Sequence, residues 1–133
     1  MKKELKDELI SKKTAMLAKE KGFDIRTSDF FCNDKELNEI NFLQYREDDD
    51  FFYRPTQSLL QRWLRLEFNC IIEIIYQYSP IDTNGKILYV STVDYYGKDF
   101  ENDLSDEPDY QSTFYEKYEK ALEVGLYEAL KMI

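Results

Sequence analysis

Residues 53–78 read YRPTQSLLQRWLRLEFNCIIEIIYQY, and this stretch decides the fold. Pro55 and Thr56 are typical of a helix start, because proline is tolerated in the first turn and a threonine hydroxyl can cap a free backbone N–H. Asn69 is a residue type that often ends a helix. Between these signals, apolar residues recur with the period of a helix, namely Leu59, Leu60, Trp63, Leu64 and Leu66. We therefore predict a helix over 56–68, with this apolar side in the core.

The residues that follow the helix predict a β-hairpin. Residues 70–78 are rich in isoleucine and tyrosine, and their side chains alternate between two faces. Both faces are apolar near the start of this strand, which indicates a covered, interior strand. Asn84-Gly85 is a strong signal for a two-residue turn, and residues 86–96 then return as the second strand.

Two further helices are expected on either side of this centre. Residues 4–21 have apolar positions at helical spacing and end at Gly22. Residues 113–131 start with a capping box, Thr113 to Glu116, and carry small residues at every fourth position, Ala121, Gly125 and Ala129. Such a row lets a helix lie close against a sheet or another helix.

Residues 23–54 are the hardest part of the chain to interpret. Asn33 or Asp34 could cap a short helix that runs through Asn41. A strand from 42–53, added to the hairpin sheet, is an open alternative. The whole pattern predicts one α+β domain over 1–133, in which a small antiparallel sheet packs against about three helices.

Composition excludes several kinds of chemistry. The chain has 133 residues, a net charge of −9 and no histidine. Without histidine there is no Ser-His-Asp or Cys-His nucleophile system and no histidine-ligated metal. Glycine-rich phosphate loops are also missing, so we expect no cofactor, no metal and no enzymatic activity. Cys32 and Cys70 form no CxxC motif, no apolar run is long enough to span a membrane, and no secretory signal opens the chain, so we expect free thiols in the cytoplasm.

Candidate contact residues come from two regions of the sequence. The polar side of the 56–68 helix, followed by a hairpin, is similar to the recognition helix and wing of a DNA-binding protein. The tyrosine-rich and acidic segments 45–53 and 94–110 suit contact with a protein, or mimicry of nucleic acid by carboxylates. Glu47 to Asp50 and the acids after Asp94 fit no calcium-loop pattern and are interpreted as solvated loops. The candidate contact face is Gln57, Gln61, Arg62, Arg65, Tyr45, Tyr53, Tyr95 and Tyr96.

Three blocks of sequence carry a resemblance: PTQSLLQRWLR at 55–65, LAKEKGF at 17–23, and YEKALEVGLYEALKMI at 118–133. With them the chain resembles small proteins of Bacteroides-type phages and mobile elements, a group for which no activity is assigned. The resemblance implies a bacterial cytosol and an accessory role.

The expected function is therefore contact with another macromolecule rather than catalysis. The net charge favours a protein partner over nucleic acid and disfavours a membrane surface. We expect a monomer or a small homo-oligomer. Two alternatives stay open: a winged-helix-like DNA-binding protein that uses the 56–68 helix, and an acidic mimic or inhibitor of nucleic-acid binding.

Overall fold

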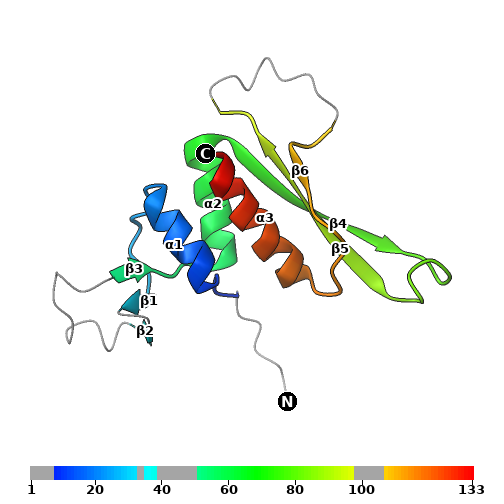
Figure 1. Cartoon of the computed structure of the whole chain (residues 1–133), viewed down its shortest axis with the longest axis horizontal. Helices are drawn as coiled ribbons and strands as arrows, with labels where there is room; N and C mark the ends of the chain where they lie inside the picture. Colours follow the sequence, from blue (N-terminus) through cyan, green and yellow to red (C-terminus); the bar gives the residue numbers. More distant parts are fainter. Residues whose placement is uncertain (1–7, 33–34, 39–50, 98–106) are drawn as a thin grey trace.

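The computed structural model describes residues 8–32, 35–38, 51–97 and 107–133. The described part contains three helices and two antiparallel three-stranded sheets, which confirms the predicted α+β class (Figure 1). In chain order the elements are α1 (Lys12–Glu20), β1 (Asp29–Cys32), β2 (Lys35–Asn38), β3 (Phe51–Tyr53), α2 (Gln57–Phe68), β4 (Cys70–Tyr78), β5 (Ile87–Tyr95), β6 (Tyr110–Gln111) and α3 (Tyr118–Met132).

The central helix and strand form as their sequence predicts. The Thr56 hydroxyl caps α2 by accepting the backbone N–H of Leu59 at 3.2 Å. Asn69 ends α2 in the left-handed conformation, with φ of 51°, and β4 starts at the next residue. Trp63 is buried, as its place on the apolar side predicts, and Leu66 is the exception, with 63% of its surface exposed.

The hairpin β4–β5 pairs nine residues from each strand, from Cys70 opposite Tyr95 to Tyr78 opposite Ile87. The predicted two-residue turn is wrong, because the strands are joined by eight residues, 79–86. Asn84 and Gly85 supply two positive-φ positions within this longer loop. The prediction of an interior strand is also wrong for the part of the chain that the structure describes: the sheet order there is β4-β5-β6, so β4 is an edge strand.

The second sheet corrects two further predictions. Phe51–Tyr53 is a strand, but it pairs with β1 in the sheet β2-β1-β3 and not with the hairpin. Aromatic contacts hold it there, with the Phe31 and Phe52 rings 5.4 Å apart. Lys35–Asn38, expected in a helix, is the strand β2, because it can pair with β1 residue by residue. Residues 39–50 lie outside the described residues.

The first helix starts later than its pattern predicts, because the residues before it lie along the start of α2. The carbonyl of Glu8 accepts the backbone N–H of Gln57 at 2.8 Å, and the backbone N–H of Ile10 donates to the carbonyl of Pro55 at 3.1 Å. The helix α1 then begins after Ser11, whose hydroxyl accepts the backbone N–H of Thr14.

The last helix also starts later than predicted, and the capping box at Thr113–Glu116 does not form. Tyr115 exchanges two backbone hydrogen bonds with Tyr89 of β5, at 2.7 and 2.8 Å. Glu116 contacts Lys86 instead of capping the helix. These contacts keep the segment extended until α3 begins at Tyr118.

The helix α3 lies against the hairpin at Gly125. A Cβ atom at this position would lie 2.9 Å from Cβ of Ser91 and 3.0 Å from Cγ2 of Ile72. The predicted row of small residues, Ala121, Gly125 and Ala129, is buried. This close approach confirms the purpose of the row, which is to bring the helix backbone onto the sheet.

We expect Gly125→Ala to destabilise the protein by about 1–3 kcal/mol, the usual cost of overpacking a core. In an exposed helix the same change is stabilising, so the sign of the effect reports the contact. Urea denaturation of the single and double variants measures it.

Ser91 provides the matched controls for this prediction. Adding Ser91→Gly should recover part of the loss, because it removes the nearest Cβ. Ser91→Ala should recover less, because it keeps that Cβ. An unchanged or raised stability of Gly125→Ala would contradict the packing described above.

Candidate interaction surface

The predicted polar side of α2 is largely used inside the protein. Gln57 is only 5% exposed, and its side-chain amide donates to the carbonyl of Glu119 at 2.8 Å. Gln61 donates its side-chain amide to the carbonyl of Ile72 at 2.9 Å. Arg62 and Arg65 are exposed. Two of these four predicted contact residues therefore join elements of the fold.

The predicted tyrosines do not gather on one surface. Tyr45 lies outside the described residues. Tyr53 is half-buried in β3, with its ring 5.0 Å from that of Phe51. Tyr95 ends β5 in the other sheet, and Tyr96 follows it, donating its backbone N–H to the carbonyl of Asn69 at 3.1 Å. The structure thus places the described tyrosines of the predicted contact face at two different sheets.

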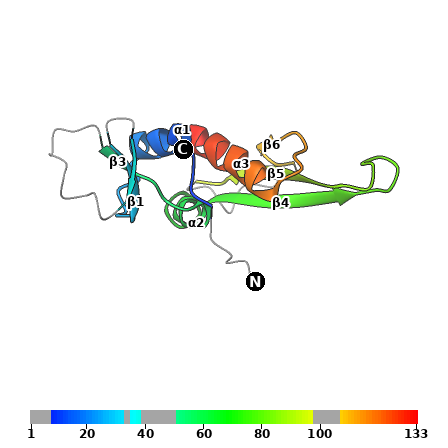
Figure 2. The ribbon, with the colours of Figure 1, turned by 90° about the horizontal axis from the view of Figure 1, so that it is seen from below.

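A different surface stands out on the distal half of the hairpin, residues 74–92, which we name the hairpin arm. Figures 1 and 2 show it projecting away from the helices. Ile81 at its tip is 85% exposed and Tyr76 is 70% exposed. The exposed large apolar residues of the arm and of the segment beside it are Ile75, Tyr76, Tyr78, Ile81, Ile87, Phe114 and Tyr118.

The outer edge of β4 presents backbone hydrogen-bonding groups. In an antiparallel strand, the N–H and C=O of one residue point to the same side, and the side alternates along the chain. The carbonyl of Ile72 points away from β5, since it accepts from Gln61 of α2. By alternation, the backbone groups of Ile74, Tyr76 and Tyr78 point the same way. No strand in the described part of the chain pairs with this edge.

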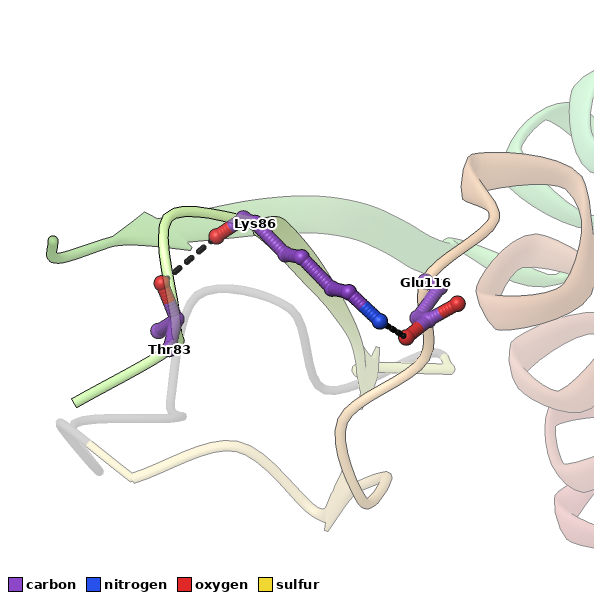
Figure 3. A network of polar contacts seen from close by, with 3 residues as sticks. All are labelled: Thr83, Lys86 and Glu116. Carbon is purple, nitrogen blue, oxygen red and sulfur yellow. Dashed lines mark hydrogen bonds and ion pairs between the residues drawn. The ribbon is translucent and has the colours of Figure 1, made fainter. Parts of the chain in front are cut away.

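The loop at the tip of the arm is held in one shape by Thr83. This residue is buried, and its hydroxyl accepts the backbone N–H of Ser79 at 3.0 Å. The same oxygen lies 2.7 Å from the Ser79 carbonyl and 2.6 Å from the Lys86 carbonyl, so it can donate to either. The Lys86 ammonium reaches Glu116 at 2.7 Å, which ties the loop to the segment before α3 (Figure 3). Ile81 is therefore presented by an ordered loop.

The arm is almost uncharged. Between Ile74 and Thr92 the only charged residues are Asp82 and Lys86. Lys86 is paired with Glu116, and their hydrogen bond raises the pKa of Lys86 and lowers the pKa of Glu116. Exposed edge strands usually carry charges or proline that discourage pairing with other chains, and IIYQY at 74–78 carries neither.

One face of the arm is hollowed where it meets the segment after β6. This groove has a volume of about 280 Å³. It is lined by Ile75, Tyr76, Gln77, Val90, Gln111 and Phe114. Backbone edge, apolar side chains and groove together can bind a chain non-covalently, and none of them supplies a nucleophile or a general base.

The signal for this surface was present in the sequence. Both faces of residues 70–78 are apolar near the start of the strand, and that pattern predicts a covered strand. The exposed positions are those beyond Ile74, where β4 extends past the core. A strand that is longer than the helices that could cover it must extend beyond the core, and this difference in length can be estimated from the sequence.

We expect the Glu116→Gln variant to loosen the tip of the arm without changing the overall fold. Backbone amides of the 79–86 loop should exchange severalfold faster, because the charged tether is lost, and the melting temperature should hardly move. Hydrogen exchange followed by NMR measures the exchange rates, and thermal denaturation measures the melting temperature. In the wild type the tether is present at neutral pH and is lost when the pH falls through the lowered pKa of Glu116. Equal exchange rates in variant and wild type would show that Lys86 does not restrain the loop.

The hairpin starts at a buried thiol, which we expect to be unreactive. Burial raises the pKa of Cys70 to about 12, and Asp109 and Asp94 add to the effect. At pH 8 roughly one molecule in ten thousand carries the thiolate, and Cys32 is buried as well. Ellman's reagent should label neither thiol in the native protein and both in urea. Rapid labelling before unfolding would contradict the burial of these residues.

The described residues form no metal site and no membrane-spanning helix. Among residues 8–32, 35–38, 51–97 and 107–133, no three cysteine or carboxylate side chains converge on a point that could hold a metal ion. None of the three described helices has the length and apolar character needed to cross a membrane. No protein-family model, curated protein or solved structure matches the chain.

Proposed function

We propose that the protein acts by non-covalent contact with another protein chain, which adds an extended strand to the open edge of β4. One observation carries this proposal: unpaired strand-edge backbone and exposed apolar side chains occur together on residues 74–78. In strand addition, main-chain hydrogen bonds supply affinity and alternate side chains supply specificity. The edge has both, so it fits an extended polypeptide.

The lack of charge on this edge favours a protein partner over a nucleic acid. Affinity for DNA depends on lysine and arginine residues that neutralise phosphates. The edge from Ile74 to Tyr78 has no charged residue, and the one lysine of the arm is held by Glu116. An apolar, uncharged strand is instead matched by another apolar strand.

The two alternative functions have less support from the described residues. DNA binding through α2 would need its polar side, and Gln57 and Gln61 are engaged within the fold. Mimicry of nucleic acid would use Glu47 to Asp50 and the acids after Asp94, most of which lie outside the described residues. From the sequence resemblance, we further propose that the contact serves an accessory role in a bacterial cytoplasm.

Site-specific photo-crosslinking in living cells tests this proposal. A photoreactive phenylalanine analogue replaces Tyr76 in one variant and Arg65 in a second, which is the matched control on the exposed side of α2. We expect the label at position 76 to yield discrete protein adducts at several times the level of the label at position 65, because the partner strand lies on the β4 edge. Denaturing gels and mass spectrometry identify the adducts.

Two results would contradict the proposal. One is the absence of protein adducts from position 76. The other is a set of adducts from position 65 that contain nucleic acid, which would place the contact on α2. Thermal denaturation of both labelled proteins verifies that they are folded before the comparison is made.

A further inference from the structure

We propose that the chain added to β4 is β4 of a second copy, paired antiparallel about a two-fold axis, so that two hairpins form one continuous six-stranded sheet. This inference rests on the proposed function and names its partner. The order of that sheet would be β6-β5-β4 in one copy followed by β4-β5-β6 in the other.

The first step is the register. Only residues whose backbone groups point outward can pair across the new interface, and these are Ile74, Tyr76 and Tyr78. The carbonyl of Ile72 is already occupied by Gln61, at 2.9 Å, so pairing cannot extend back to that residue without losing this bond. An antiparallel register centred on Tyr76 uses all three free positions, because Ile74 of one copy then lies opposite Tyr78 of the other. A register shifted back to Ile75 would require Ile72.

The second step is charge. An antiparallel pair of identical strands places each residue opposite a residue of the same short segment. Residues 74–78 contain no acid and no base, so no like charges meet across the axis. Glu73, the nearest acid, lies opposite Ser79 in this register, and Lys86 and Asp82 lie in the loop. The paired segments therefore bring no like charges directly opposite each other.

The third step is apolar area. A fully exposed side chain of this size has an accessible area of about 200 Å². At their exposed fractions, the seven apolar residues of the arm and its neighbouring segment leave about 800 Å² open to solvent. A standard stable interface buries about 800 Å² per partner. Pairing of the two β4 edges covers the part of this area that lies on Ile75, Tyr76 and Tyr78 of each copy, while Ile81 at the tip stays outside the contact.

Symmetry adds a further reason for a second copy. A two-fold interface uses the same patch on both partners and closes after two chains. Any other partner would have to match this apolar edge with an unrelated sequence. Pairing of two copies covers the open β4 edge of each copy. A covered edge can no longer pair with further chains.

The test uses the wild-type protein and the variant Tyr76→Cys. Sedimentation velocity of the wild type at micromolar concentration should show a dimer. Opposite residues in such a pair have Cα atoms about 5.5 Å apart, within the range for a disulfide. With diamide as the oxidant, which removes the two thiol hydrogens, Tyr76→Cys should form a covalent dimer at least tenfold faster than Ile81→Cys. Position 81 is the matched control, because it is more exposed and reports random collisions.

Two substitutions separate the edge backbone from the tyrosine ring. Tyr76→Pro removes an N–H that points away from β5, so it leaves the hairpin ladder intact and should abolish the dimer. Tyr76→Thr keeps this N–H and a residue that favours strands, so it should still dimerise, more weakly than the wild type. Thermal denaturation shows that each variant is folded.

The outcomes distinguish this inference from the function on which it rests. Two results would overturn the second copy as partner. One is a monomeric wild type at 100 times the protein concentration in the cells of the crosslinking experiment. The other is covalent dimer formation at equal rates by Tyr76→Cys and Ile81→Cys. If the label at position 76 still crosslinks a different protein in cells, the proposed function stands without the dimer. If that label gives no protein adduct and the protein is monomeric, both are wrong. A dimer lost in Tyr76→Pro and kept in Tyr76→Thr supports both.

Discussion

The contact of α3 with the hairpin at Gly125 determines which part of the sheet can be buried. Ile72 and Ser91 lie so close to this glycine that the helix backbone rests on the strands. A helix of fifteen residues is about 22 Å long, whereas two nine-residue strands and their loop extend beyond about 30 Å. With α3 placed over the proximal half, no described helix is left to cover the distal half. The exposed hairpin arm is therefore a consequence of how the core packs.

Polar side chains secure the helices that hold this core. The Glu123 carboxylate of α3 accepts the backbone N–H of Ser11 at 3.3 Å and the hydroxyl of Thr14, at the N-terminus of α1. A negative charge at this end of a helix is favourable, because the free N–H groups there carry a partial positive charge. Gln57 of α2 reaches the same helix, at Glu119. Each such hydrogen bond is worth about 0.5–1.5 kcal/mol, and losing one partner of a buried pair costs more.

Local signals in the sequence predicted the elements whose contacts are local. The cap at Thr56, the left-handed stop at Asn69 and the alternation in 70–78 need only neighbouring residues, and all three are as predicted. Signals failed where a distant partner intervened: Glu116 has the spacing of a capping box, but Lys86 and Tyr89 hold its segment extended. The exposure of the hairpin arm depends on a distant partner in the same way. Whether IIYQY is buried or open depends on where α3 lies, and the side chains of Gln57 and Gln61 donate to backbone carbonyls on other elements.

The negative charge of the chain is unevenly distributed along the sequence. The described residues contain fifteen acids and thirteen bases, so the folded part is close to neutral, and most of the net −9 belongs to the other residues. Total charge governs solubility and long-range encounter, while the affinity of a short strand depends on what lies within a few ångströms of it. At Ile74 to Tyr78 that environment is backbone amide, isoleucine and tyrosine. An acidic protein can therefore carry an apolar, uncharged strand edge.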